Sequence, residues 1–162
     1  MSFEPRARRR LLTSLAVVAA AALPVLWGFN RLVPRPTGLG ATDGRLRGCP
    51  DSPNCVGSQA EDPAHRVAPL TFAGTGPEAW ARLQRVLGDL PGATRITASD
   101  RYLHYEFRTR VCRFVDDVEF LLDEPARVIH VRSASRVGYS DLGANRRRIE
   151  EIRRRFEESR GG

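Results

Sequence analysis

Residues 102–137 read YLHYEFRTRVCRFVDDVEFLLDEPARVIHVRSASRV, and this stretch decides the fold. Apolar and polar residues alternate over Tyr102–Arg110, and the alternation returns around Val118–Leu122 and over Val128–Val137. A period of two residues is typical of β-strands with one buried face. A shorter candidate strand, Thr94–Ala98, precedes them. Because short turns join consecutive strands, we expect an antiparallel sheet.

A helix is predicted ahead of these strands. Thr75 and Glu78 have the spacing of a capping box, in which each side chain accepts the other's backbone N–H. Pro91–Gly92 is expected to end this helix. Between them, spacings of three and four place four large side chains on one helical face: Trp80, Leu83, Leu87 and Leu90.

A second helix is expected near the C-terminus, with Ser140 or Asp141 as its N-cap. One face of this helix carries Asn145, Ile149, Ile152 and Phe156. Both helices must bury their apolar faces against the sheet. The sequence therefore predicts an α+β fold, a compact two-layer domain. Its antiparallel sheet of about four to five strands is packed by an internal helix and a C-terminal helix, and an N-terminal membrane helix precedes it.

The N-terminal part of the chain consists of a basic tail and an apolar run. Residues 1–10 carry four arginines, and residues 11–29 are almost uninterruptedly apolar. As a helix this run would span roughly 28 Å, close to the ~30 Å hydrocarbon core of a bilayer. Trp27 lies near its far end, where interfacial aromatic residues are common. We therefore expect a signal anchor, a single transmembrane helix.

Alternatives to a retained anchor stay open. A signal peptide can be cut after the small residues 20–22, although the apolar run continues beyond them. Residues 8–12, RRRLL, partly resemble a twin-arginine export signal. The arginines of the short tail favour a domain on the periplasmic or extracytoplasmic side of the cell membrane. Arginines that follow the span leave the reversed orientation open.

Composition indicates the remaining boundaries. Residues 30–47 are rich in proline and glycine and poor in large apolar side chains, so they are expected to form a linker. The globular domain is expected over residues 48–158. Within it, residues 48–66 are rich in turn formers and leave little room for a helix or strand.

The distribution of charge argues against a nucleic-acid partner. The formal net charge is +7, and all 26 cations are arginines. Residues 1–47 carry eight arginines and two acids, while residues 48–162 carry eighteen arginines and seventeen acids. A nucleic-acid-binding domain needs clustered surplus charge to neutralise phosphates, and this domain is nearly neutral. The basicity instead indicates membrane topology.

Three stretches of the domain have the look of signature motifs. They are Cys49–Val56 (CPDSPNCV), Phe114–Phe120 (FVDDVEF) and Val131–Gly143 (VRSASRVGYSDLG), followed by Asn145–Arg146. In this order the motifs resemble the domain of unknown function catalogued as family 1499, over roughly residues 48–157. The chain departs from that pattern at Cys112, where an apolar residue is expected, and at Gly57, where serine is usual. The resemblance implies a small domain, often behind a membrane segment, with no assigned activity.

Cys49 and Cys55 enclose five residues. In an exported protein we expect them to form a local disulfide that pins the turn-rich segment. A zinc site with His65 as a further ligand is the alternative, but the Cys-x5-Cys spacing matches no common zinc finger. We therefore expect no metal and no cofactor. Cys112 is expected to be a free thiol packed within a strand.

Asp116, Asp117 and Glu119 form the most concentrated acidic feature. Carboxylates can bind divalent cations or work as an acid–base pair. Adjacent residues of a strand point to opposite faces, so Asp116 and Asp117 can share a site only at a bulge. The alternative is structural: one carboxylate caps a turn while another pairs with Arg132 or Arg136 on a neighbouring strand.

Polar residues also gather where the last strand ends and the last helix begins. Ser133 and Ser135 share a strand face with apolar residues, and Asn145 lies on the apolar face of the helix, so each needs a partner or a cavity. We expect Asn145 to approach one of the serines. These residues form either a network that fixes helix docking or an anion pocket at the helix N-terminus. The candidate binding residues are Arg132, Ser133, Ser135, Arg136, Tyr139, Asp141, Asn145 and Arg146, with Asp116, Asp117 and Glu119 as one wall.

The sequence favours a membrane-anchored, exported domain that is not an enzyme. We expect a binding or assembly module that recognises a partner protein or an anionic small ligand, and no residue is assigned a catalytic role. A purely structural role in a membrane assembly is a second interpretation. The enzymatic alternative is a metal-assisted hydrolase or lyase that uses Asp116, Asp117 and Glu119.

Overall fold

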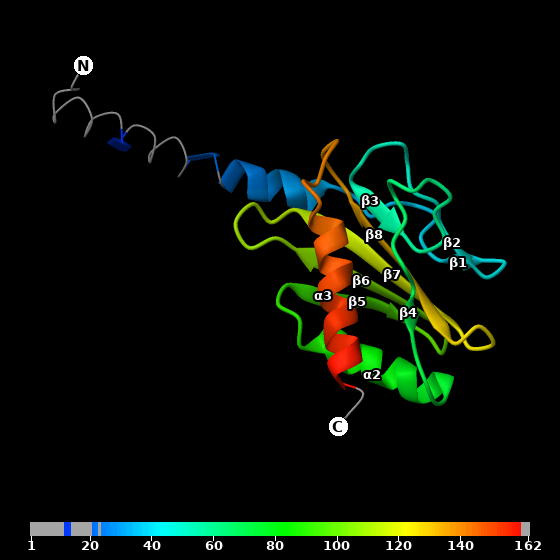
Figure 1. Cartoon of the computed structure of the whole chain (residues 1–162). Helices are drawn as coiled ribbons and strands as arrows, with labels where there is room; N and C mark the ends of the chain where they lie inside the picture. The colour runs from blue at the N-terminus through cyan, green and yellow to red at the C-terminus, as the bar shows by residue number, and fades with distance from the viewer. Residues whose placement is uncertain (1–11, 14–20, 23, 160–162) are drawn as a thin grey trace, which may run out of the picture.

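The structure is a computed structural model that describes residues 12–13, 21–22 and 24–159 (Figure 1). In this part of the chain, a six-stranded antiparallel sheet has the order β3-β8-β7-β6-β5, with β4 also paired to β8. A separate hairpin precedes the sheet. Its strands are β1 (Ala41–Thr42) and β2 (Arg45–Leu46), and those of the sheet are β3 (Cys55–Gly57), β4 (Leu70–Thr71), β5 (Ala93–Ala98), β6 (Tyr102–Arg108), β7 (Val115–Asp123) and β8 (Val128–Ser135).

The α+β architecture and the four longer strands are confirmed, but among the described residues the main sheet has six strands rather than four to five. The sequence does not predict β3 and β4, because two or three residues are too few to show alternation. The expectation of turns alone over residues 48–66 is wrong at Cys55–Gly57. There Val56 pairs with Ser133 of β8.

The internal helix, α2 (Gly76–Gly88), begins as predicted. The hydroxyl of Thr75 accepts the N–H of Glu78 at 3.4 Å, and Glu78 Oε2 accepts the N–H of Thr75 at 3.2 Å, which confirms the capping box. The helix ends ahead of Pro91–Gly92, because Asp89 already caps it. Gly92 has a φ of +80°, and a Cβ there would lie 2.6 Å from the carbonyl oxygen of Arg108.

The C-terminal helix, α3 (Ala144–Glu158), has Gly143 as its N-cap, in the left-handed conformation. The prediction of Ser140 or Asp141 as the N-cap is therefore wrong. Asp141 nevertheless supports the first turn from outside the helix. Its carboxylate accepts the N–H of Gly143 at 2.9 Å and the N–H of Asn145 at 2.6 Å. The sequence signal was real, but the residue acts two positions ahead of the N-cap.

Both helices cover the same face of the sheet, which makes the domain two-layered (Figure 1). Their predicted apolar faces are buried. The core between helices and sheet includes Trp80, Leu83, Leu87, Leu103, Phe120, Val131, Ile149, Ile152 and Phe156.

The other face of the sheet is covered by a segment that we call the strap, residues 33–50. Arg35 Nε donates to Glu106 Oε1 at 2.7 Å, and the N–H of Gly40 donates to Glu119 Oε1 at 2.8 Å. The strap includes the β1–β2 hairpin, and β2 contacts β7 and β8. Much of the segment expected as a linker thus packs on the sheet.

A helical segment, residues 24–32, precedes the strap. Within the described ranges, no helix combines the length and the apolar character needed to cross a membrane. Most of the predicted span, residues 11–29, lies outside the described residues. The N-terminal membrane helix therefore stays a prediction.

Candidate functional site

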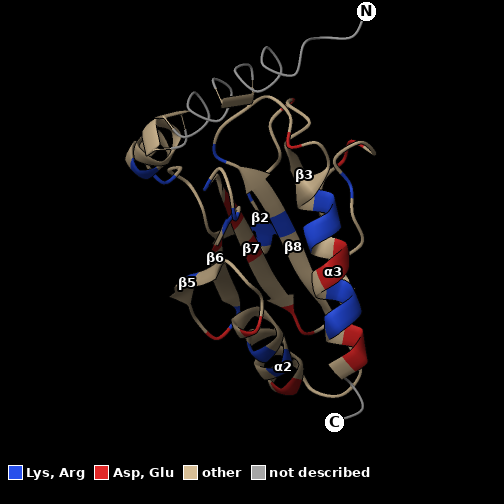
Figure 2. Cartoon of the chain, turned by 90° about the vertical axis from the view of Figure 1, so that its left-hand side faces the viewer, with Lys and Arg blue, Asp and Glu red and all other residues tan. Residues whose placement is uncertain are grey.

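Alternation along β7 and β8 divides the candidate residues between the two faces of the sheet, instead of gathering them in one corner. Acidic and basic positions lie next to one another on these central strands (Figure 2). On the helix side we define the docking network as Asp116, Ser133, Ser135, Asn145 and Arg148. On the strap side we define the strap network as Arg35, Tyr102, His104, Glu106, Arg108, Asp117, Glu119, Arg132 and Arg136.

Asn145 is the centre of the docking network and is fully buried. Its Oδ1 accepts the hydroxyl of Ser133 at 2.5 Å and Arg148 Nη1 at 2.6 Å. Its Nδ2 donates to the carbonyl oxygen of Asn54 at 2.8 Å and to Ser135 Oγ at 3.0 Å. The predicted approach of Asn145 to the serines is confirmed, and its amide has no capacity left for a ligand.

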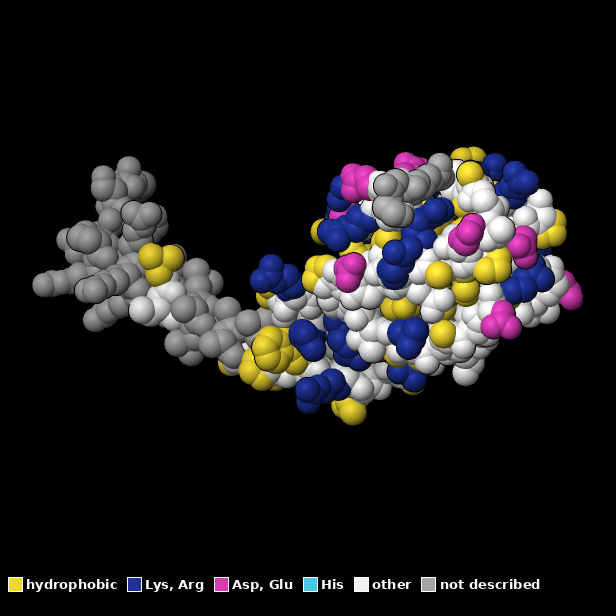
Figure 3. All heavy atoms as spheres, turned by 90° about the horizontal axis from the view of Figure 1, so that it is seen from below, with side chains coloured by type: hydrophobic (Ala, Val, Ile, Leu, Met, Phe, Trp, Pro, Cys, Tyr) yellow, Lys and Arg dark blue, Asp and Glu magenta, His cyan; other side chains and the backbone are white. Residues whose placement is uncertain are grey.

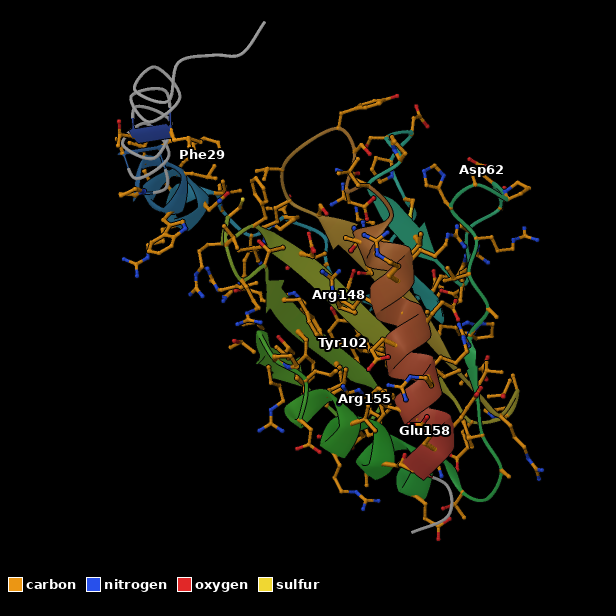
Figure 4. The ribbon with its side chains drawn as sticks, turned by 60° about the vertical axis from the view of Figure 1, so that its left-hand side comes forward. Phe29, Asp62, Tyr102, Arg148, Arg155 and Glu158 are labelled. Atoms are coloured by element: carbon orange, nitrogen blue, oxygen red, sulfur yellow. A yellow bond between two sulfur atoms is a disulfide. The ribbon has the colours of Figure 1, made fainter. Side chains whose placement is uncertain are left out.

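Arg148 connects this network to β7 and comes from α3 (Figure 4). Its Nη2 donates to Asp116 Oδ2, and its Nη1 donates to Ser133 Oγ at 3.0 Å. The guanidinium also lies 5.1 Å from the ring centre of Phe107. The docking network is thus a set of mutually bonded polar groups that fixes α3 on the sheet, which is the structural alternative that the sequence left open.

In the strap network, Glu119 is fully buried and accepts three hydrogen bonds. The donors are Tyr102 Oη at 2.8 Å, the Gly40 N–H at 2.8 Å and Arg132 Nη1 at 3.0 Å. Burial raises the pKa of Tyr102, and the charge of Glu119 raises it further. The phenol therefore stays protonated and donates to the carboxylate.

Asp117 and Arg136 form the second half of the strap network. Arg136 Nε and Nη2 donate to the two oxygens of Asp117 at 2.8 and 2.7 Å, and Nη2 also donates to Glu106 Oε1 at 2.6 Å. His104 Nε2 lies 2.7 Å from Asp117 Oδ1. The bidentate ion pair between Arg136 and Asp117 is the structural alternative that the sequence analysis gave for the acidic residues.

The ionisation of these groups follows from their surroundings. Burial raises the pKa of Asp117, but hydrogen bonds from Arg136 and His104 outweigh it, so its pKa lies below the ordinary value. The pKa of Glu106 is likewise lowered, because bonds from Arg136 and Arg35 overcome its burial. The hydrogen bonds to Asp117 and Glu106 raise the pKa of Arg136. Asp117, Glu106 and Arg136 are therefore charged at neutral pH.

A pocket of about 390 Å³, which we call the strap pocket, lies between the strap and β8. A second pocket of about 190 Å³ lies beside it, and the two share Arg132 and the chain from Arg47 to Cys49. All three signature motifs contribute to the strap pocket. Its lining consists of Pro36, Arg47, Gly48, Cys49, Pro50, Asp117, Arg132, Ala134, Ser135 and Arg136.

Arg132 lies where the two pockets meet, and its side chain is only 7% exposed. Its Nη1 is bonded to Glu119, but its Nε is buried and has no hydrogen-bond partner in the described part of the chain. A buried donor without an acceptor costs about 1–3 kcal/mol. Arg132 is therefore the lining residue whose hydrogen bonding the described residues leave incomplete.

The arginines that line the strap pocket differ in how their charge is paired. Arg132 is bonded to Glu119, and Arg136 is bonded to Asp117 and Glu106. Arg47 forms no ion pair among the described residues, and its Nη1 donates to the carbonyl oxygen of Thr37 at 2.7 Å. Arg47 is therefore the lining arginine that can offer its charge to an anion.

Seven of the eleven predicted binding residues do not line the strap pocket. Asp116, Ser133 and Asn145 belong to the docking network on the other face of the sheet, and Glu119 is buried in the strap network. The remaining three are Tyr139, Asp141 and Arg146. Tyr139 is 77% exposed in the loop after β8. The carboxylate of Asp141 accepts the N–H groups of Gly143 and Asn145 at the start of α3. These two N–H groups are therefore not available to a ligand. Arg146 donates to the carbonyl oxygens of Arg66 and Ala64 at 2.8 and 2.7 Å and thereby holds a loop.

The acidic residues do not form one cluster. Asp116 points to the helices and bonds Arg148, whereas Asp117 and Glu119 point to the strap, as the alternation of a regular strand requires. Among the described residues, no group of three histidine, cysteine or acidic side chains is arranged to hold a metal ion.

Sequence reasoning located the polar face of β6 but gave it no role in the site, and it gave the strap none. Tyr102, His104 and Glu106 alternate with apolar residues on β6, and their occurrence on a central strand was a usable signal. Arg35 and Arg47 gave no signal, because the segment expected as a linker carries no periodicity.

A row of Ser58, His130 and Asp123 was also missed. Ser58 Oγ lies 3.2 Å from His130 Nδ1, and His130 Nε2 lies 3.6 Å from Asp123 Oδ2. Ser58 Oγ already accepts the N–H of Val131 at 2.9 Å. The three side chains are therefore best explained as structural contacts that hold Ser58, which follows β3, against β8.

The Cys49–Cys55 disulfide is confirmed and closes the turn that lines the strap pocket. Cys112 is a free thiol, as expected. It lies in the turn between β6 and β7 and not within a strand, so that part of the prediction is wrong. The turn interrupts the alternation at residues 109–114, where the sequence showed no glycine or proline to mark it.

A family model described as a protein of unknown function (DUF1499) matches residues 45–156. The chain belongs to this family. The DUF1499 match begins within β2 and ends within α3, so it includes the whole six-stranded sheet and every residue of the strap pocket except Pro36. No match was found among curated proteins or among solved structures.

Proposed function

We propose that this DUF1499 chain is a membrane-anchored, exported binding module that takes a small anionic ligand in the strap pocket and is not an enzyme. The observation that carries the proposal is Arg132, whose buried Nε–H has no acceptor among the described residues and which lines the pocket. A carboxylate or phosphate oxygen would supply the missing acceptor and would gain a charge-assisted bond.

Size and shape favour a small molecule over a partner protein. The strap pocket of about 390 Å³ falls within the roughly 300–1,000 Å³ range of small-molecule sites. A stable protein partner would need a much larger contact surface, about 800 Å² on each side. Arg47, at the exposed rim, is placed to make a second contact with the anion.

The metal-assisted hydrolase or lyase has less support. It needs Asp116, Asp117 and Glu119 on one site, but Asp116 lies on the opposite face of the sheet. The other two carboxylates are each bonded to an arginine, and a metal ion would have to displace those arginines from buried positions.

The membrane anchor in this proposal is supported by the sequence. Residues 11–29 are long and apolar enough to span a bilayer, and the arginines of residues 1–10 favour an exported domain. The strap pocket belongs to the folded unit that follows this apolar run in the sequence.

The test is a titration of the full chain in detergent micelles with inorganic phosphate and with succinate, followed by NMR at the Arg132 Nε–H signal. We expect a saturable shift with at least one of the two anions. Arg47→Gln should weaken that binding about tenfold, because a charge-assisted contact is worth about 1.5–3 kcal/mol. Its melting temperature should fall only slightly, since Arg47 is exposed and its hydrogen bond to the carbonyl oxygen of Thr37 is solvent-accessible.

Arg95→Gln is the matched control, because Arg95 is an exposed arginine on β5, outside the strap pocket. It should bind as the wild type does. The absence of a saturable shift with both anions would overturn the proposal, as would an equal loss of affinity in Arg47→Gln and Arg95→Gln.

A further inference from the structure

We propose that the junction of residues 24–32 with the β6–β7 turn binds the phosphate headgroup of an anionic phospholipid. A pocket of about 250 Å³, the junction pocket, lies there, and nothing in the strap pocket contributes to it. Its lining includes Trp27, Asn30, Arg31, Arg108 and Arg113.

Hydrogen bonds hold the helical segment, residues 24–32, on the β6–β7 turn. Trp27 Nε1 donates to the carbonyl oxygen of Val111 at 2.7 Å, and Asn30 Nδ2 donates to that of Cys112 at 2.8 Å. Asn30 is buried between the helical segment and the turn. Two hydrogen bonds to successive carbonyls fix the segment on the turn, so the walls of the junction pocket are held in place.

The charge of the junction pocket is positive and only partly neutralised. Arg108 pairs with Glu106 at 3.1 Å. Arg31 and Arg113 are exposed and form no ion pair with any carboxylate that the structure describes. Arg113 holds a left-handed φ of 59°, which is costly for a residue other than glycine. Three guanidinium groups around one small cavity match the oxygens of a phosphate.

Apolar side chains surround these arginines. Trp27 is 45% exposed, Phe29 is 56% exposed and Val111 is 63% exposed. Hydrophobic and arginine side chains lie together where the N-terminal segment joins the domain (Figure 3), and Phe29 lies on the helical segment, away from the sheet (Figure 4).

This combination distinguishes a phospholipid from a soluble phosphate. A free anion needs the arginines alone, whereas exposed tryptophan, phenylalanine and valine beside them are stabilised only when acyl chains or the headgroup boundary cover them. Tryptophan with arginine is the usual composition at the membrane interface, where the aromatic ring sits at headgroup depth. The occupant is therefore an anionic phospholipid with its phosphate in the junction pocket.

The experiment is native mass spectrometry of the full chain released from micelles that contain equal amounts of phosphatidylglycerol and phosphatidylcholine. We expect phosphatidylglycerol to be retained about tenfold over phosphatidylcholine. The double variant Arg31→Gln, Arg113→Gln should reduce this preference to within about twofold. Val111→Asn should lower retention of both lipids, because it removes apolar contact without changing charge.

The matched control is Arg85→Gln, Arg127→Gln, which removes two exposed arginines outside the junction pocket. This control variant should retain the preference for phosphatidylglycerol over phosphatidylcholine.

Equal retention of both lipids by the wild type would overturn the proposal, and so would an undiminished preference in the double variant Arg31→Gln, Arg113→Gln. Displacement of the lipid by an equal concentration of glycerol 3-phosphate would also overturn it, because the site would then bind phosphate without the chains. If the double variant melts below the wild type, each single substitution is measured against the same outcomes.

Discussion

Arg136 holds Asp117 and Glu106 in their charged form inside the strap network. Both carboxyls have pKa values below their ordinary values of 3.8 and 4.5. A carboxyl whose folded pKa is lowered contributes stability that is complete above its unfolded pKa and is lost as the pH falls through the folded one. We therefore expect the wild type to lose stability progressively as the pH falls below about 4.5.

Replacing Arg136 should change the sign of this dependence for Asp117. Without the guanidinium, only the hydrogen bond and charge of His104 oppose the burial that raises the pKa of Asp117. We therefore expect the pKa of that carboxyl to rise and the variant to gain stability as the pH falls through the raised value. We expect Arg136→Met to lose about 3–5 kcal/mol at pH 7, as is usual when one partner of a buried pair is removed. Urea midpoints at pH 7, 5 and 3.5 measure both effects. Arg85→Met, at an exposed position, should keep the wild-type pH dependence, and a parallel loss of stability on acidification in both variants would contradict the assignment.

At the scale of an element, the position of α3 depends on one amide. Asn145 bonds β8 through Ser133 and Ser135 and the loop before β3 through Asn54. Asn145→Ala leaves several buried polar groups without a partner, each worth about 1–3 kcal/mol. We expect the free energy of unfolding to fall by about 3 kcal/mol in urea titrations.

Glu157→Ala provides the comparison on the same helix, because Glu157 is exposed. Its free energy of unfolding should stay within about 0.5 kcal/mol of the wild type. A loss of less than about 1 kcal/mol in Asn145→Ala would mean that apolar packing alone docks α3.

Elements whose periodic pattern extends over many residues could be predicted from the sequence, whereas strands of two or three residues could not. The alternation over Tyr102–Arg110 located β6 and even assigned His104 and Glu106 to the polar face. β3 has only three residues and exists because β8 offers it a partner. The N-cap of α3 was misplaced for a similar reason: Asp141 is a good capping residue, but Gly143 adopts the left-handed conformation that begins the helix.

At the scale of the whole molecule, the site itself could not be predicted. The strap network joins Arg35 to Glu106, 71 residues apart, and Gly40 to Glu119, 79 residues apart. Nothing periodic marks the strap, so its place on the sheet follows only from tertiary contacts. The sequence did identify Arg132, Arg136, Asp117 and Glu119 as important, and it missed that Asn145 works on the opposite face.

Trp27, within the proposed anchor, donates a hydrogen bond to the carbonyl oxygen of Val111 in the β6–β7 turn. The anchor itself leads to a prediction about the whole chain in a membrane. We expect an N-terminally tagged chain to keep its tag and to resist alkaline carbonate extraction, while protease added to intact spheroplasts digests the domain. Leu15→Arg, Val17→Arg places two charges within the apolar run, each costing about 2.5–3.5 kcal/mol at the centre of a span. This variant should leave the membrane fraction, whereas Ala41→Arg, Thr42→Arg, in the exposed strand β1, should stay in it. Loss of the tag with a soluble domain would show a cleaved signal peptide instead, and a domain digested only after lysis would show the reversed orientation.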